Sequence, residues 1–283
     1  MLLFTGRNSI CTQKVLITLF EKGLSWDTKR VDLFKNEQYD PAYLKYNPKG
    51  VVPTLVHNDK PIIESTLICE YLDETFPSPS LVPPSPYDRA QMRLWSKQID
   101  EGIFEATREI SFSAMFREKL RNMSDEQRNI RFNNVGDPSR SARFRSTYEH
   151  GTDSPYVLYA VASFEKMFNA MNETLSDGRK WLVTNNLTLG DINLMPFVAR
   201  LEYLNMLDIF IDERPSVQAW WARSKELSSY KKAIPEMLDE EDLSTMKISG
   251  AKIREQIRAR REEHLTQYKK AAQKQARNAG VKP

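Results

Sequence analysis

A proline-rich segment divides this chain into two parts of different character. Residues 76–86, FPSPSLVPPSP, hold five prolines. Proline fixes its own φ and lacks a backbone donor, so this segment cannot be a helix. Strand-like runs and turns precede it, and helical periodicity follows it. We therefore expect an α/β domain at residues 1–76, a linker at 77–86, an all-helical domain at 87–236 and a C-terminal extension at 237–283.

The pattern of residues 1–76 predicts the element order βαβ-α-ββα. An apolar strand at 1–4, a helix to about residue 22 and a strand at 26–32 form a βαβ unit, in which the two strands run parallel. A turn at 47–50 leads into strand character at 51–57. A hairpin turn at 58–60 then leads to a short strand and a helix at 66–76.

Pro53 falls inside a strand pattern, where its missing N–H is unfavourable. We therefore expect it at the first position of the strand, after a cis Val52–Pro53 bond. Such a bend would turn the N–H and C=O of Val52 outward. There they could pair with an extended peptide ligand as an added strand would.

Small polar side chains gather where two of the helices begin. Ser9, Cys11 and Thr12 lie at the start of the first helix, where free N–H groups stabilise an anion and lower the pKa of a thiol. The turn is therefore suited to a thiolate, either the protein's own or that of a thiol substrate. The alternative is that Ser9 or Thr12 only caps the helix.

At the second such helix start, Ser65 and Thr66 offer hydroxyls and N–H groups to a carboxylate, and Glu64 offers an acceptor to an ammonium group. The alternative is an ordinary cap that follows a hairpin.

The composition excludes several classes of protein. No apolar run approaches the ~18 residues of a membrane span, and the N-terminus lacks the features of a secretory signal. Two cysteines are too few for a disulfide framework and fit a reducing cytoplasm, and we expect Cys69 to be a small core residue. The three histidines are scattered, so we expect no metal site.

Two segments of the helical part stand out. Thr188 and Asp191 are spaced as a capping pair, in which each side chain reaches the backbone N–H of the other. Arg140, Arg143 and Arg145, together with Phe144 and Tyr148, form a basic aromatic stretch. We interpret this stretch as a solvated loop, with the wall of a pocket for an acidic or aromatic substrate as the alternative.

The extension carries most of the positive charge. Residues 250–283 hold ten Lys or Arg and three Glu, a net charge of +7, which leaves −4 for the rest of the chain. The extension has strong helix formers but no sustained apolar stripe, which predicts a solvated helix or a disordered tail. The alternative is binding to an anionic partner such as nucleic acid or a membrane surface. Nucleic acid is not an expected partner, because Tyr268 is the one Phe, Tyr or Trp among these charges.

Three motifs together resemble the glutathione transferases over about residues 2–235. They are Ser-x-Cys-Thr-x-Lys-Val at the first helix, Asn-Pro-Lys-Gly-Val-Val-Pro at 47–53, and Glu64-Ser65. The resemblance implies a thioredoxin-like N-terminal domain, an all-helical glutathione-transferase C-terminal domain, and glutathione as co-substrate. The spacing Thr188-x-x-Asp191 also matches the buried capping box of that family.

The resemblance also implies how glutathione is held. Val52 pairs with its cysteinyl backbone beside cis-Pro53, and Glu64 and Ser65 hold its γ-glutamyl end. Gln38 and Lys49 reach its glycine carboxylate. Ser9 or Cys11 meets its sulfur.

Two bacterial groups of the family are similar in different segments. Residues 9–14 and 191–215 are similar to tetrachlorohydroquinone reductive dehalogenase and the maleylacetoacetate isomerases. Residues 20–24, 64–72 and 89–95 are similar to β-aryl etherases, which do not carry Ser-x-Cys at this place.

The resemblance implies a transferase that takes part in the degradation of aromatic compounds. It also implies that the protein is a homodimer. In it, the glutathione thiolate attacks an electrophilic carbon of an apolar, aromatic substrate, as in β-aryl ether cleavage. One alternative is a reductive dehalogenase or thiol-dependent isomerase that uses Ser9 and Cys11. Another is a non-catalytic binding or scaffold protein with the same fold.

Overall fold

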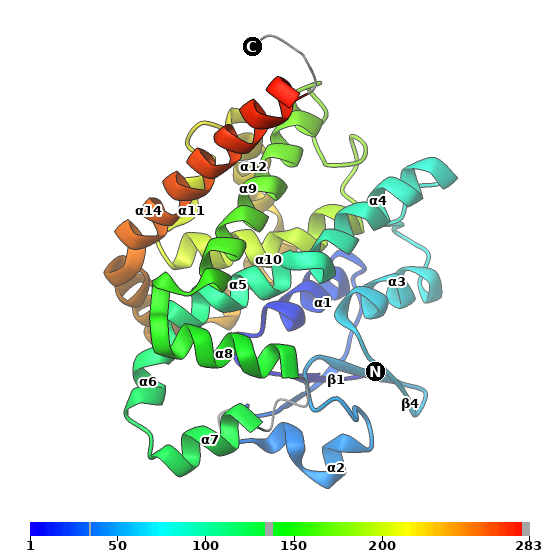
Figure 1. The fold of residues 1–283 in the computed structure, drawn as a ribbon. Coiled ribbons are helices and arrows are strands. Elements are labelled where there is room, and N and C mark those ends of the chain that lie inside the picture. The colour runs from blue at the N-terminus through cyan, green and yellow to red at the C-terminus, as the bar shows by residue number, and fades with distance from the viewer. Residues whose placement is uncertain (34, 134–137, 279–283) are drawn as a thin grey trace. The chain divides into compact units, whose positions relative to one another are not determined.

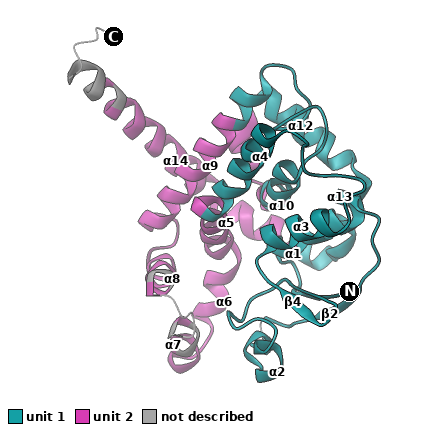
Figure 2. Ribbon diagram, turned by 90° about the vertical axis from the view of Figure 1, so that its right-hand side faces the viewer, with its two compact units in different colours: residues 1–100, 171–200, 214–243 teal, residues 101–170, 201–213, 244–283 magenta. Residues whose placement is uncertain are grey.

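The computed structural model describes residues 1–33, 35–133 and 138–278 (Figure 1). The chain forms two compact units (Figure 2). Unit 1 comprises residues 1–100, 171–200 and 214–243, and unit 2 comprises residues 101–170, 201–213 and 244–283. The domain boundaries at residues 76, 86 and 236 stay predictions.

A four-stranded sheet forms the N-terminal part of unit 1. Its strands lie in the order β2-β1-β3-β4, with the bounds β1 Leu2–Thr5, β2 Asp27–Arg30, β3 Thr54–His57 and β4 Lys60–Ile62. β1 runs parallel to β2 and antiparallel to β3, and β4 is antiparallel to β3. The expected βαβ unit with parallel strands is therefore confirmed.

Two helices cover one face of this sheet. α1 (Ile10–Glu21) and α3 (Ser65–Thr75) lie side by side on it, and the short α2 (Pro41–Leu44) lies on the other face, after the 3₁₀ turn η1 (Glu37–Tyr39) (Figure 1 and Figure 2). Both long helices bury apolar side chains, among them Val15 and Ile17 of α1 and Ile68 of α3, each with 0% exposure. Their packing fixes where both helices begin.

The Val52–Pro53 peptide bond is cis, as the sequence predicts. β3 begins only at Thr54, so Pro53 precedes the strand and does not occupy its first position. Among the residues that the structure describes, the backbone N–H and C=O of Val52 enter no hydrogen bond. They are therefore available to a ligand that binds as an added strand.

Unit 1 also contains the helical elements α4 (Pro86–Gln98), most of α10 (Leu189–Tyr203), α12 (Pro215–Glu226), α13 (Ser228–Ala233) and η5 (Pro235–Met237). Asp191 is fully buried, and its carboxylate accepts hydrogen bonds from Leu182 N at 2.8 Å, Thr188 Oγ1 at 2.9 Å and Trp220 Nε1 at 3.0 Å. The capping pair is confirmed on the side of Asp191. The Thr188 hydroxyl, however, donates to that carboxylate, whereas we expected it to accept from the N–H of Asp191.

Unit 2 is helical in its described residues. Its elements are α5 (Phe104–Ser111), η3 (Phe112–Phe116), α6 (Arg117–Arg121), α7 (Asp125–Asn133), α8 (Pro138–His150), η4 (Gly151–Asp153), most of α9 (Pro155–Leu175) and α11 (Leu207–Ile211). The π-helical turn η2 (Ile99–Ile103) lies between α4 and α5 in the chain. Phe164, Phe168 and Phe210 pack together in the core of this unit.

The basic aromatic stretch is part of α8, so its interpretation as a loop is wrong. The guanidinium of Arg143 stacks over the ring of Tyr156 at 4.8 Å, and that of Arg145 stacks over the ring of Phe132 at 5.1 Å. These cation–π contacts fix α8 within unit 2. The side chain of Arg140 and residues 134–137 lie outside the described residues.

The C-terminal extension forms the long helix α14 (Glu240–Asn278). Met246, Gly250 and Ile257 are buried against unit 2, and Arg261 forms an ion pair with the buried Glu165 at 2.6 Å. Arg254 also pairs with Asp208. Of the two alternatives, the helix is confirmed for the described residues and the disordered tail is wrong there. The helix is not solvated on every face, because Met246, Gly250 and Ile257 are buried. None of the described helices combines the length and apolarity that a membrane span requires.

The packing of α14 requires glycine at position 250, because a Cβ there would overlap the carbonyl oxygen of Leu204. We expect Gly250→Ala to lower the free energy of unfolding by about 1–3 kcal/mol, the usual cost of overpacking. Denaturant unfolding of the full chain measures it. Lys252→Ala, at an exposed position of the same helix, is the control and should change stability by less than about 0.5 kcal/mol. Equal effects of the two substitutions would contradict the close approach.

Candidate active site

The turn that leads into α1 is held in one conformation. Asn8 has a φ of 60°, in the left-handed region that non-glycine residues seldom adopt. Arg200 of α10 donates a hydrogen bond of 2.8 Å to the carbonyl oxygen of Asn8 and another to its side-chain oxygen. Burial lowers the pKa of Arg200 to about 10, which leaves it protonated at neutral pH. The next residue, Ser9, is therefore presented in a fixed orientation.

Ser9 is the N-cap of α1. Its hydroxyl oxygen accepts a hydrogen bond from Thr12 N at 3.3 Å. A hydroxyl that accepts through a lone pair keeps its own hydrogen for donation. The two interpretations of Ser9, as a cap and as part of a site, are therefore compatible: the oxygen caps the helix, and the hydrogen remains for a sulfur anion.

The same turn lies against Val52. A Cβ on Gly6 would come within 2.8 Å of Val52 Cγ2, so glycine permits this approach. Buried Asn47 fixes the neighbouring backbone, because its Nδ2 donates to the carbonyl oxygen of Val51 at 2.9 Å and to Thr54 Oγ1 at 3.1 Å. The hydroxyl of Tyr43 donates to the same carbonyl oxygen. The sequence motif thus places the free backbone of Val52 beside the turn that carries Ser9.

The start of α3 faces α1. Lys14 Nζ of α1 donates to Ser65 Oγ at 3.2 Å and to Thr66 Oγ1 at 2.8 Å. Cys11 also faces this cluster and is partly exposed. Burial raises the pKa of its thiol, and the Lys14 ammonium and the Ser65 hydroxyl offset that effect only in part. The Cys11 thiol is therefore protonated at neutral pH in the free protein.

Cys69 lies behind this cluster with no exposed surface, which confirms it as a core residue. Burial raises the pKa of its thiol to about 11, so it is unreactive at neutral pH.

Glu64 and Lys49 form an ion pair, with 2.6 Å between Lys49 Nζ and Glu64 Oε1. Both side chains are exposed, Lys49 at 61% and Glu64 at 46%, so this ion pair contributes little to the stability of the fold. Glu64 has a φ of 70°. Such strained backbone is often found at functional sites, where the surrounding structure maintains it.

Gln38 lies in η1 and is 9% exposed. Within the described part of the chain, its side-chain oxygen is buried without a hydrogen-bond partner. A buried polar group of this kind needs an explanation, and a bound ligand or water is one. The backbone carbonyl of Gln38 lies against the turn at Gly50. Gln38 and Lys49 therefore flank the same turn.

The structure brings candidate residues together in three places: the turn that carries Ser9 lies against Val52, Cys11 faces Ser65, and Glu64 pairs with Lys49 near Gln38. Sequence reasoning missed the roles of Lys14, Asn47 and Arg200. Lys14 and Asn47 stand in the motifs that carry the resemblance, but the motifs do not show that their side chains are buried. Among the described residues, no group of three His, Cys, Asp or Glu side chains is placed to hold a metal ion.

Comparisons with known proteins agree with this arrangement. Residues 8–75 match the family model "Glutathione S-transferase, N-terminal domain" and residues 137–227 match "Glutathione S-transferase, C-terminal domain". Protein LigF of Sphingobium sp. strain SYK-6 is 35% identical over 190 residues, which cover 66% of this chain and 72% of LigF. Tetrachloro-P-hydroquinone reductive dehalogenase of Sphingobium chlorophenolicum is 26% identical over 243 residues, 82% of this chain and 94% of that protein.

A solved structure is similar as well. The crystal structure of beta-etherase LigF superimposes with a TM-score of 0.71 at 30% identity and covers 83% of this chain and 98% of its own. These similarities extend over both the sheet-containing part and the helical part. The chain therefore belongs to the glutathione S-transferase family and is a glutathione-dependent enzyme.

Proposed function

We propose that this enzyme activates glutathione at the start of α1 and uses its thiolate to attack an electrophilic carbon of an apolar, aromatic substrate. Cleavage of a β-aryl ether is the reaction that we favour, because the 35%-identical relative LigF is a beta-etherase. The observation that carries the proposal is the capping geometry of Ser9, whose oxygen accepts from Thr12 N and whose hydroxyl hydrogen remains for donation, in a turn that lies against Val52.

In this proposal, glutathione binds as an extended peptide. Its cysteinyl backbone pairs with the N–H and C=O of Val52 next to Pro53. Its γ-glutamyl end binds Ser65 and Glu64 at the start of α3, where the free N–H groups of the helix favour a carboxylate. Its glycine carboxylate lies near Gln38 and Lys49, and the ammonium group of Lys49 is exposed enough to exchange Glu64 for it.

The sulfur then lies at the N-terminus of α1. The thiol of free glutathione resembles that of cysteine, with a pKa of about 8.5, so it is mostly protonated at neutral pH. Donation from the Ser9 hydroxyl and the first N–H groups of the helix stabilises the thiolate, and a decrease of ~2 pKa units corresponds to ~2.7 kcal/mol. In ether cleavage a C–S bond forms and the C–O bond breaks. The aryloxide leaves with the electron pair and takes up a proton.

A second candidate function is reductive dehalogenation or a thiol-dependent isomerisation. It is favoured by the similarity to the dehalogenase and by the place of Cys11 in the first turn of α1. In the reductive reaction, the Cys11 thiolate would attack the sulfur of a glutathione adduct. An S–S bond forms, the C–S bond breaks, and the carbon takes the electron pair and a proton. A second glutathione then reduces the mixed disulfide. An isomerase would consume no glutathione.

The test compares wild type, Ser9→Ala and Cys11→Ala with glutathione and a panel of β-aryl ethers, halogenated hydroquinones and 1-chloro-2,4-dinitrobenzene, followed by mass spectrometry. We expect wild type to release phenol and a glutathione thioether from the ethers. Ser9→Ala should lower kcat/KM by roughly 10–100-fold, since ~2 kcal/mol of thiolate stabilisation is lost. Cys11→Ala should leave ether cleavage unchanged.

The other outcomes separate the alternatives. A Cys11→Ala variant that accumulates a glutathionyl product from the hydroquinones supports the reductive function. Turnover without consumption of glutathione supports the isomerase. A wild-type protein that neither binds glutathione nor converts any of these compounds would contradict the proposal and favour a scaffold.

The two functions also differ in what they require of Cys11. Because the pKa of its thiol is raised, its alkylation by iodoacetamide should increase with pH and reach half of its maximum only above pH ~8.5, the ordinary value for cysteine. Site-specific mass spectrometry separates Cys11 from Cys69. A rate that has levelled off below pH ~8 would show a reactive thiolate in the free protein and would favour the reductive function.

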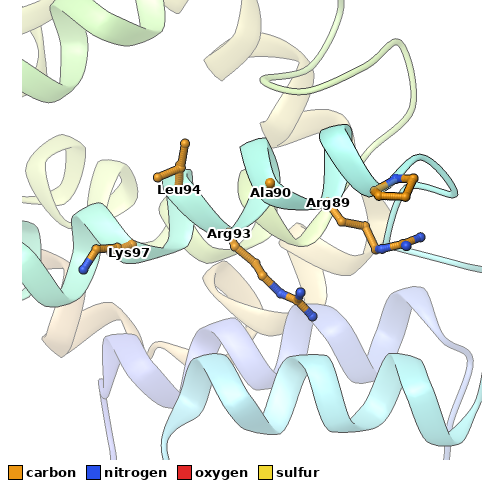
Figure 3. Close-up of a pocket in the computed structure, with 6 residues that line it drawn as sticks. Arg89, Ala90, Arg93, Leu94 and Lys97 are labelled. Carbon is orange, nitrogen blue, oxygen red and sulfur yellow. The ribbon is translucent and has the colours of Figure 1, made fainter.

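We also propose that the enzyme is a homodimer. A pocket of about 500 Å³ lies along the outer face of α4, lined by Pro86, Arg89, Ala90, Arg93, Leu94 and Lys97 (Figure 3). Leu94 is 52% exposed, and Leu67 of α3 is 57% exposed. The face of α4 is basic, and α3 carries Glu70 and Glu74. Arg93 of α4 pairs with Glu70 of α3 within one chain at 3.1 Å, so a two-fold dimer would rest on the exposed apolar side chains of these two helices.

Size-exclusion chromatography with light scattering tests the dimer. We expect wild type to be a dimer and Leu94→Glu to be a folded monomer, because the substitution places a charge at the centre of an apolar contact. Ile248→Glu, at a 58%-exposed position of α14, is the matched control and should remain dimeric. A monomeric wild type would contradict the proposal. We further propose a cytoplasmic location, which suits the two free thiols.

A further inference from the structure

Two buried lysines, one within α1 and one at its C-cap, have different partners. Lys14 is 1% exposed and Lys22 is 5% exposed, and both reach towards α3. Lys22 Nζ forms an ion pair with Asp73 at 2.6 Å and donates to the carbonyl oxygen of Pro79 at 2.6 Å. Lys14 Nζ donates to the hydroxyls of Ser65 and Thr66. Within the residues that the structure describes, no carboxylate pairs with Lys14.

The lack of a carboxylate partner among the described residues makes the burial of Lys14 unfavourable in free energy. A buried ammonium group is unfavourable unless an opposite charge compensates it. Asp73 supplies that charge for Lys22, so the charge of Lys22 is compensated within the protein. Hydroxyl groups accept from two of the three N–H donors of Lys14 but carry no charge. In the described part of the chain, the ammonium group of Lys14 at the start of α3 therefore has hydroxyl partners but no ion-pair partner.

Lys14 polarises the hydroxyls of Ser65 and Thr66. Each accepts from Lys14 through a lone pair and so keeps its hydrogen for an acceptor, which for Ser65 in the free protein is the Cys11 sulfur. Because the donor that they accept from is charged, both hydroxyls become stronger donors. The free N–H groups in the first turn of α3 act in the same direction. A carboxylate that binds there would meet two polarised hydroxyls with a cation behind them.

We infer that Lys14 is the buried counter-ion of the γ-glutamyl carboxylate of glutathione and acts on it through the hydroxyls of Ser65 and Thr66. The inference rests on the proposed binding of glutathione at α3. Lys14 is a positioning residue: it does not touch the ligand, but it fixes the hydroxyls and compensates the charge of the ligand. The bound carboxylate compensates the positive charge of Lys14, as Asp73 compensates that of Lys22.

Isothermal titration calorimetry with two peptides tests this role. One peptide is glutathione, and the other is 4-aminobutyryl-cysteinyl-glycine, which lacks only the γ-glutamyl carboxylate. We expect wild type to bind the second peptide roughly 10–100-fold more weakly, the range for a charged hydrogen bond. Lys14→Met should weaken the binding of glutathione by a similar factor and leave the binding of the second peptide nearly unchanged. Lys14→Arg should retain most of the preference for glutathione.

Lys22→Met is the matched control, since it removes the other buried lysine of the same helix. It should lower the melting temperature, because Asp73 loses its partner, and leave the affinity for glutathione unchanged. If Lys14→Met does not fold, Lys14→Gln keeps a donor for the hydroxyls without the charge.

Three results would overturn the inference while leaving the proposed function in place. They are a folded Lys14→Met or Lys14→Gln variant with wild-type affinity for glutathione, an equal loss for both peptides, and a wild type that binds both peptides equally well. A wild type that binds neither peptide would instead overturn the proposed function, and this inference with it.

Discussion

The turn from Gly6 to Ser9 is the constraint on which the candidate site depends. Asn8 lies in the left-handed region, and Arg200, which follows it by 192 positions, holds it there by hydrogen bonds to two of its oxygens. Gly6 lets the same turn lie against Val52. Helix α1 therefore begins after its N-cap Ser9, in a turn that lies against Val52. Through this turn, the helical part of unit 1 determines where a thiolate would lie relative to the residues that precede β3.

Much of this arrangement could be predicted from the sequence, because it follows from local rules. Pro53 in a strand pattern implied a bend before β3, and the cis bond is present there. The Thr188–Asp191 spacing implied a capping pair, and the buried carboxylate of Asp191 forms it. The small polar residues at Ser9 and Ser65 mark the beginnings of α1 and α3. Caps, turns and proline act over a few residues, so a sequence shows them directly.

The remaining features could not be predicted, because they depend on distant partners or on missing side chains. The packing of α14 relies on Gly250, which has no side chain and so adds nothing to an apolar stripe. Its ion pair with Glu165 joins residues 96 positions apart. Lys14 and Lys22 are buried, although lysine in a helical pattern normally indicates a solvated face. The arginines of α8 looked like the charges of a loop, and they stack on aromatic rings instead.

The central claim is that the start of α1 stabilises the thiolate of bound glutathione through Ser9. The most direct measurement is a pH titration of the thiolate absorbance of glutathione bound to wild type and to Ser9→Ala. The account predicts that the bound thiol ionises ~2 pKa units below the free thiol in wild type, and that the pKa moves back towards the free value in Ser9→Ala while glutathione remains bound. A bound thiol that titrates like free glutathione in wild type would contradict the account.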